Sequence, residues 1–201
     1  MNRQVVLIAV LDANVLYPAP LRDYLLHLAE LELYRPKWTD YIQEEWIDNL
    51  LKNRKDLKRK DLQKTQKAMD RAFPDANIAY YQKGINSLSL PDPDDRPILA
   101  AAISAKAQVI VTANVKDFPA AKLQDYAVVA RHPDKFVLNL IDIDQERAVI
   151  ALENQVKRLQ NPPMPIERVL ENLARCGLTK SVARLRTIIP YRSTKQAATD
   201  K

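Results

Sequence analysis

The sequence predicts an α/β protein, a three-layer α/β/α sandwich around a parallel sheet of four or five strands, with a small C-terminal helical extension. Short apolar runs that end in polar residues alternate with helical patterns over the first two thirds of the chain. From residue 144 onward only helical patterns follow. We therefore expect an α/β domain over residues 1–141, a helical extension over 142–190 and a disordered tail over 191–201.

The first predicted strand covers residues 5–11, a run of apolar residues with three valines and an isoleucine. Such a run is typical of a strand that is buried on both faces of a parallel sheet. It ends at Asp12. In an open α/β sheet the functional crevice lies at the carboxyl ends of the strands, so Asp12 is placed for chemistry. Capping of the following helix is the alternative role for this side chain.

A second acid is predicted on a helix that Thr39 caps. Residues 21–31 form a helix before it, and residues 34–38 are extended. In the capped helix Glu45 lies at the edge of the apolar stripe, whereas Glu44 points toward solvent. An acid at a buried edge needs a partner, and a bound cation would be one.

Positive charge is concentrated in two segments. Residues 52–71 carry nine Lys and Arg against three Asp, and residues 157–201 carry ten against three acids. The rest of the chain is acidic, because the whole has a net charge of only +6. An acidic body with basic segments suits a protein that holds a polyanion beside a carboxylate site, although solvated helix faces are the alternative. Residues 52–71 are predicted to continue as helix, either as a long exposed arm or as part of a helical hairpin.

Three acids follow within four positions, Asp92, Asp94 and Asp95. We expect Asp94 or Asp95 to cap a helix that has Pro97 in its first turn. Capping explains one of the three acids, and three uncompensated carboxylates repel each other unless a cation screens them. A short strand is predicted nearby, at residues 78–82 or 87–90.

The second buried strand, residues 109–111, also ends in polar side chains, Thr112, Asn114 and Asp117. A further strand is predicted at residues 126–130. The last helices are expected at residues 146–159, 166–176 and 178–189.

The composition favours a soluble, cytoplasmic protein with no membrane segment, since no apolar run approaches the roughly 20 residues that span a bilayer. The single cysteine, Cys176, excludes an internal disulfide and a cysteine-rich zinc site. Oxygen ligands without convergent histidine or cysteine point to Mg²⁺ or Mn²⁺. Such ions commonly serve phosphoryl chemistry.

Four blocks of the sequence together resemble the signature blocks of PIN-domain ribonucleases, including VapC-type toxins of toxin–antitoxin modules. These blocks are Asp12-Ala-Asn14, Thr39 with Glu45, Asp95 with the alanine-rich helix, and Thr112-Ala-Asn114-Val-Lys-Asp117. The resemblance spans residues 5–140. It implies a metal-dependent endoribonuclease whose partners are RNA, a cognate antitoxin and, in a homodimer, a second copy of the chain.

The resemblance also assigns roles to residues. It implies that Asp12, Glu45, Asp95 and Asp117 are the catalytic, metal-binding acids, and that Asn14 and Thr112 fix the geometry around them. Many relatives have an aspartate where this chain has Asn114, so the fourth charge must come from Asp117.

Two other functions compete with the nuclease. One is a catalytically weak PIN fold that binds nucleic acid or protein, to which the neutral Asn114 points. The other is a haloacid-dehalogenase-like phosphatase, which the sequence disfavours because that chemistry needs an aspartate at the position of Asn14. Arg22 and Arg96 are candidates for gripping a phosphate, with surface ion pairs to Asp23 and Asp94 as the alternative.

Overall fold

The computed structural model describes the backbone of residues 6–199 and the side chains of residues 6–189. The chain forms two compact units. The first contains the chain up to Pro18 and residues Tyr34–His132, and the second contains Ala19–Leu33 and the chain from Pro133 onward. The boundaries differ from the expected division at residue 141, because one early helix and the helix after residue 132 pack with the C-terminal helices.

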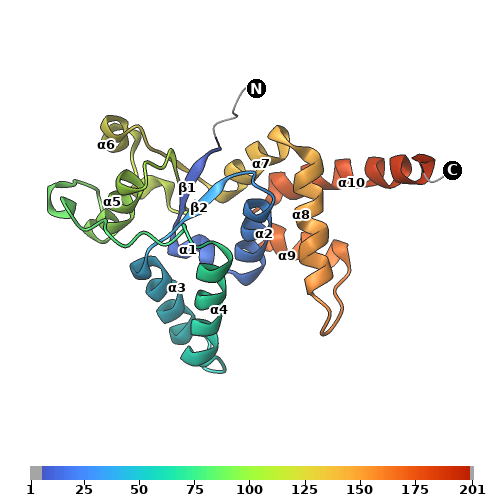
Figure 1. The fold of residues 1–201 in the computed structure, drawn as a ribbon, viewed down its shortest axis with the longest axis horizontal. Coiled ribbons are helices and arrows are strands. Elements are labelled where there is room, and N and C mark those ends of the chain that lie inside the picture. Colours follow the sequence, from blue (N-terminus) through green and yellow to red (C-terminus); the bar gives the residue numbers. More distant parts are fainter. Residues whose placement is uncertain (1–5, 200–201) are drawn as a thin grey trace. The chain divides into compact units, whose positions relative to one another are not determined.

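The first unit is built on a four-stranded, all-parallel sheet in the order β2-β1-β3-β4. Figure 1 labels its neighbouring strands β1 and β2. The strands are β1 (Ile8–Leu11), β2 (Arg35–Lys37), β3 (Val109–Val111) and β4 (Val129–Arg131). The predicted α/β class and parallel sheet are thus confirmed. Position 5, the predicted start of the first strand, lies outside the described residues.

The order of the strands decides where a site can form. From the central strand β1 the chain moves to β2 on one side, and it later returns to place β3 and β4 on the other side. The carboxyl ends of β1 and β3 therefore lie side by side at a topological switch point, where open α/β sheets bind their ligands. The Asp12 amide donates a hydrogen bond of 3.1 Å to the carbonyl of Val111, which joins the two strand ends directly.

Five helices of the first unit follow from local signals in the sequence. They are α1 (Ala13–Leu16), α3 (Asp40–Asn53), α4 (Arg59–Ala72), α5 (Arg96–Ser104) and α6 (Ala120–Leu123). Thr39 caps α3 as predicted, because its hydroxyl accepts a hydrogen bond of 3.2 Å from the amide of Ile42. The alanine-rich helix α5 packs on β1 and β3.

The strand predicted at residues 78–82 or 87–90 is wrong. Within the part of the chain that the structure describes, neither segment joins the sheet. Around residue 77 there is only an isolated bridge between Trp38 and Asn77, in which the Trp38 amide donates to the carbonyl of Ala76 and the Ile78 amide donates to the carbonyl of Trp38. Residues Ile85–Ser87 form a 3-10 turn. Further 3-10 turns cover Pro93–Asp95, Val115–Asp117 and Gln124–Tyr126.

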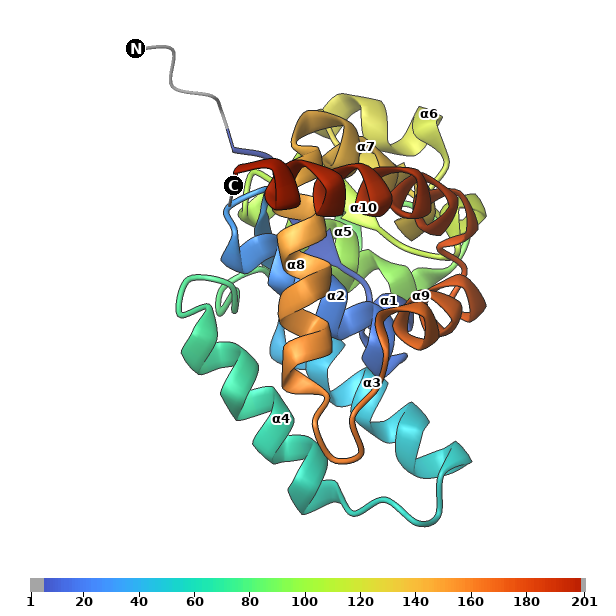
Figure 2. The same ribbon diagram turned by 90° about the vertical axis from the view of Figure 1, so that its right-hand side faces the viewer.

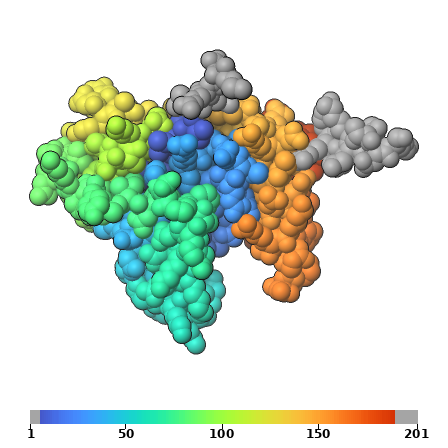
Figure 3. Space-filling view, viewed as in Figure 1, coloured from blue at the N-terminus to red at the C-terminus, as the bar shows by residue number. Residues whose placement is uncertain are grey.

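The basic segment is part of a helical hairpin, one of the two predicted alternatives (Figure 1). Figure 3 shows that this part of the chain protrudes at the surface. Helix α3 ends at Asn53, and Arg54 turns back to an ion pair of 2.6 Å with Asp56. Helix α4 has only two buried side chains, Leu62 and Met69. Its ends are held by ion pairs from Arg59 to α3 and by the indole of Trp38, which donates to Asp70 at 2.9 Å.

The second unit is entirely helical. It contains α2 (Ala19–Glu30), α7 (Pro133–Ile143), α8 (Gln145–Arg158), α9 (Ile166–Arg175) and α10 (Thr179–Thr199). Helices α2 and α8 lie side by side (Figure 2), and the Tyr24 hydroxyl donates a hydrogen bond of 3.1 Å to the carbonyl of Ala148. The Asp134 carboxylate accepts the amides of Lys180 and Ser181 at the start of α10, at 3.0 and 2.8 Å. No helix within the described residues has both the length and the apolar character needed to cross a bilayer.

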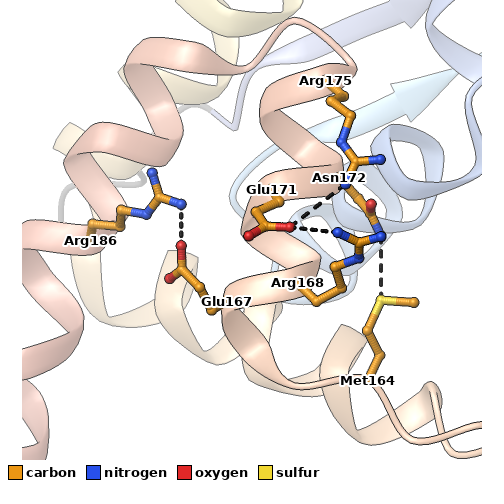
Figure 4. Close-up of polar contacts among 7 residues, drawn as sticks. All are labelled: Met164, Glu167, Arg168, Glu171, Asn172, Arg175 and Arg186. Atoms are coloured by element: carbon orange, nitrogen blue, oxygen red, sulfur yellow. Dashed lines mark hydrogen bonds and ion pairs between the residues drawn. The ribbon is translucent and has the colours of Figure 1, made fainter.

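Helix α10 continues to Thr199, through most of the segment for which the sequence indicates disorder, while positions 200 and 201 lie outside the described residues. Helix α9 carries a network of charges on its exposed side (Figure 4). Glu171 pairs with Arg168 at 2.8 Å and with Arg175 at 3.7 Å, and a further ion pair joins Glu167 to Arg186. Two acids thus neutralise part of the positive charge of residues 157–201.

Candidate active site

The site is organised around Asp12, whose carboxylate is held by two side chains at the ends of β1 and β3. The Thr112 hydroxyl donates to Asp12 Oδ2 at 2.6 Å, and Asn14 Nδ2 donates to the same oxygen at 2.5 Å. Asn14 also accepts the amide of Ala113 through Oδ1 at 2.9 Å. This amide side chain therefore bridges the two strand ends as well as positioning the acid.

The hydroxyl of Thr112 is fully used in this network. It donates to Asp12 and accepts from Asn14 Nδ2 and from the amide of Asn114, both at 3.0 Å. Thr112 is completely buried, and Asp12 is only 4% exposed. Burial raises the pKa of Asp12, while the bonds from Thr112 and Asn14 act against that rise because they favour the charged form.

An open cleft of about 340 Å³ lies above these residues within the first unit. Its lining combines acids, amides and one phenol: Asp12, Ala13, Asn14, Tyr17, Glu45, Asn49, Asp95 and Asn114. The structure thus brings together three of the four predicted acids. It also places Glu45 half-buried and Glu44 exposed on α3, as the helical spacing predicts.

The acids of the cleft repel one another. Burial, followed by the charges of Asp12 and Asp94, raises the pKa of Glu45 to about 7. Burial and the charges of Asp12, Asp92 and Asp117 likewise raise the pKa of Asp95 to about 7. None of the described residues that line the cleft carries a positive charge. The cleft therefore concentrates negative charge that its own side chains leave unbalanced.

Asp95 is the N-cap residue of α5, as one of the two predicted alternatives has it, but its side chain makes no capping hydrogen bond. Asp92 instead caps the 3-10 turn Pro93–Asp95 that leads into α5, because its carboxylate accepts the amide of Asp94 at 2.9 Å. The Asp95 carboxylate is therefore not used as a cap, and it lines the cleft.

Asn114 lines the cleft, whereas Asp117 is absent from its lining. Asp117 is the last residue of the 3-10 turn Val115–Asp117, and its backbone amide donates a hydrogen bond of 3.0 Å to the carbonyl of Asn114. Its charge still acts on Asp95. The cleft therefore has a neutral amide at position 114, and the acid lies one 3-10 turn further along the chain.

The donor set suits a hard divalent cation, because carboxylate and amide oxygens surround a negatively charged cleft. Among residues 6–189, no three His, Cys, Asp or Glu side chains already converge closely enough to hold an ion. Asp12 is fixed by its hydrogen bonds. A hard cation that keeps several of its waters needs only one or two carboxylate ligands, and its charge would offset the mutual repulsion of Asp12, Glu45 and Asp95.

Three residues near the acids are not predicted from the sequence. Tyr17 and Asn49 line the cleft, and the Tyr41 hydroxyl lies 3.4 Å from the carbonyl of Asp94. Asn49 and Tyr41 lie four residues on either side of Glu45, so helical spacing could have identified them once Glu45 was chosen.

The two arginine candidates differ. Arg22 belongs to the second unit and lies 3.8 Å from Asp23, the predicted partner, but it is buried and not at the surface. Arg96 is in the first unit at the start of α5, and neither arginine lines the cleft. The alternative pair of Arg96 with Asp94 does not form among the described residues, and its Nε is buried without a hydrogen bond there.

Comparison with known proteins gives two family matches. The family described as PIN domain matches residues 8–116, and the family described as VapC50 C-terminal domain matches residues 133–187. The chain is 34% identical over 96 residues to a protein of Mycobacterium tuberculosis (strain ATCC 25618 / H37Rv) named "Putative ribonuclease VapC50". The match covers 48% of this chain and 56% of that relative. No solved structure matches the chain.

Proposed function

Because the chain belongs to the PIN-domain family, we propose that it is a metal-dependent endoribonuclease that hydrolyses RNA phosphodiester bonds, as the toxin of a toxin–antitoxin module. One observation carries the proposal. Asp12, Glu45 and Asp95 meet in one cleft at the switch point of a parallel sheet, with no cationic side chain in its described lining.

Asp12, Glu45 and Asp95 would hold the ion, with Asp117 near enough to Asp95 to add charge. Oxygen ligands favour Mg²⁺ or Mn²⁺. When bound, such an ion lowers the pKa of water and neutralises charge that develops on the phosphate. The fit rests on the donor set and on the unbalanced negative charge of the cleft.

The protein's own side chains have separate tasks in this proposal. Thr112 and Asn14 hold Asp12 in one orientation, so that the acid does not have to be ordered during the reaction. Without a cation, burial and the neighbouring acids raise the pKa of Glu45 to about 7, and a bound cation would favour its charged form. Asn14 and Asn114 supply neutral amide groups at the cleft, beside the acids.

The basic face of α4 would bind the backbone of the RNA. Lys60, Lys64, Lys67 and Arg71 recur at intervals of four, three and four residues, so they share one side of the helix, and all four are exposed. Phosphate contacts of this kind position a nucleic acid without reading its sequence. A cognate antitoxin and a second copy of the chain remain proposed protein partners.

The test is cleavage of a mixed RNA pool by the wild type and by Asp12→Asn, each with Mn²⁺ and with a chelator. We expect cleavage only by the wild type with the metal. Asp125→Asn, which alters an exposed aspartate outside the cleft lining, is the matched control and should cleave like the wild type. Equal cleavage by Asp12→Asn would show that the site is wrong.

Asn114 motivates the second candidate, a PIN fold that binds RNA or a protein without turnover, because it places a neutral amide in the cleft. This function predicts RNA binding that survives chelation and no cleavage under any metal condition. The same experiment separates the two functions.

A further inference from the structure

Helix α3 presents a row of side chains that extends past the acids on both sides. Tyr41, Glu45, Asn49 and Asn53 follow one another at intervals of four residues, which places them along one slanting ridge of the helix. From Tyr41 to Asn53 the helix advances by twelve residue steps, which correspond to about 18 Å along its axis. Glu45 and Asn49 line the cleft, and the outer two members lie beyond them.

A tyrosine hydroxyl lies at each end of this row: Tyr41 is itself the first member, and Tyr17, which is outside the row, contacts the last member, Asn53. At one end, the Tyr41 hydroxyl lies 3.4 Å from the carbonyl of Asp94. At the other end, Asn53 Nδ2 donates a hydrogen bond of 3.2 Å to the hydroxyl of Tyr17, a residue that lines the cleft. Both rings therefore flank the acids, one on either side of Glu45.

Tyr41 is 40% exposed, although its hydroxyl lies beside the acid loop. The hydroxyl approaches the loop while part of the ring remains in contact with solvent. Burial and the charges of Glu45, Asp94 and Asp95 raise the pKa of Tyr41, so the phenol stays neutral at physiological pH. A neutral aromatic surface next to a negatively charged cleft can contact a nucleic-acid base without adding repulsion.

We propose that Tyr41 is a stacking platform for an unpaired base of single-stranded RNA, next to the phosphodiester bond that lies over the acids, and that Tyr17 has the same role on the other side. This inference rests on the proposed ribonuclease function and adds the residue that would hold a base next to the acids. Aromatic side chains stack on bases that are splayed out of a helix, and such bases are found in single strands, loops and bulges. The cleft is open, and its volume of about 340 Å³ lies within the usual range of ligand sites.

The test is RNA binding measured by fluorescence anisotropy in EDTA, where no metal-dependent cleavage occurs. The probes are a labelled single-stranded oligonucleotide and a blunt duplex of the same sequence. Stacking of one base contributes about 1–3 kcal/mol, so Tyr41→Ala should weaken single-strand binding by roughly 5- to 150-fold. Its duplex affinity should stay within twofold of the wild type.

Three further variants isolate the ring. Tyr41→Phe and Tyr41→Trp keep an aromatic face and should bind the single strand within twofold of the wild type or more tightly. Tyr126→Ala removes a tyrosine of the same unit with nearly the same exposure, 39%, which does not line the cleft, and should leave binding unchanged. Circular dichroism establishes that each variant is folded.

The proposal is overturned if Tyr41→Ala binds the single strand like Tyr126→Ala, or if Tyr41→Phe loses as much affinity as Tyr41→Ala. Equal weakening of duplex binding would also overturn it, because stacking requires an unpaired base. Failure of the ribonuclease proposal looks different. The wild type would not cleave RNA with Mn²⁺, while the dependence of single-strand binding on Tyr41 would persist.

Discussion

Replacement of Thr112 by valine would remove the hydroxyl that joins the two strand ends at the candidate active site, with little change in side-chain volume. The variant loses the 2.6 Å bond to the Asp12 carboxylate and the acceptor of the Asn114 amide. A hydrogen bond to a charged group contributes about 1.5–3 kcal/mol, and one between neutral groups about 0.5–1.5 kcal/mol. We therefore expect Thr112→Val to lower the free energy of unfolding by about 3 kcal/mol.

The assay is thermal or urea unfolding of the metal-free protein at pH 8, followed by circular dichroism. For a chain of this length about 3 kcal/mol corresponds to a decrease in Tm of roughly 6–12 °C. Thr112→Ser keeps the hydroxyl and should lose about 1 kcal/mol or less, through one methyl group. The RNA cleavage rate with Mn²⁺ should follow the same order, because Asp12 loses its orientation only in the valine variant.

A double-mutant cycle with Asp12→Asn checks the cause. If the charged acceptor makes Thr112 important, Thr112→Val should cost less in the Asp12→Asn background, by about 1–2 kcal/mol. Refutation takes one of two forms. Either Thr112→Val and Thr112→Ser unfold within 0.5 kcal/mol of each other, about the error of such comparisons, or the cost of Thr112→Val is the same in both backgrounds.

Two further predictions concern charge. In the metal-free protein Asp95 has a pKa of about 7, above its unfolded value near 3.8. Its contribution to the free energy of unfolding is therefore most favourable below pH 4 and is lost as the pH rises from 4 to 7. Asp95→Asn should therefore raise Tm at pH 8 and change it little at pH 4. The control is Asp125→Asn, which removes an exposed charge outside the cleft lining, and equal gains of Asp95→Asn at both pH values would contradict the assigned cause. On α4, replacing Lys60, Lys67 and Arg71 together by Gln should weaken single-stranded RNA binding and reduce the slope of log affinity against log salt by about 2, since each lost phosphate contact removes about 0.7. Lys64→Gln alone should change the slope least, because Asp61 already pairs with Lys64 at 2.8 Å, and an unchanged slope in the triple variant would exclude α4 from RNA binding.

Much of the fold and part of the site follow from local sequence. The apolar runs before Asp12 and Thr112 predict two buried parallel strands, and the carboxyl ends of such strands share one edge of the sheet. The cap at Thr39 and the helical spacing after it predict that Glu45 lies at a buried edge. These signals are local, since they depend on side-chain periodicity and on backbone donors within a few residues.

Tertiary structure alone decided what gathers in the cleft. Glu45 and Asp95 lie fifty residues apart in the sequence, and only the packing of α3 and α5 around the sheet brings both next to Asp12. The same packing brings in Asn114 rather than Asp117, because a 3-10 turn carries the acid away from the strand end.

The division of the chain also could not be read from the sequence. The helix over Ala19–Glu30 has the apolar stripe that is typical of a surface helix, and this pattern does not identify the element against which the helix packs. In the structure it packs on α8 in the second unit, with a hydrogen bond from Tyr24 to Ala148. Periodicity determines which face of a helix is buried, whereas its partner depends on shape and contacts between residues more than a hundred positions apart.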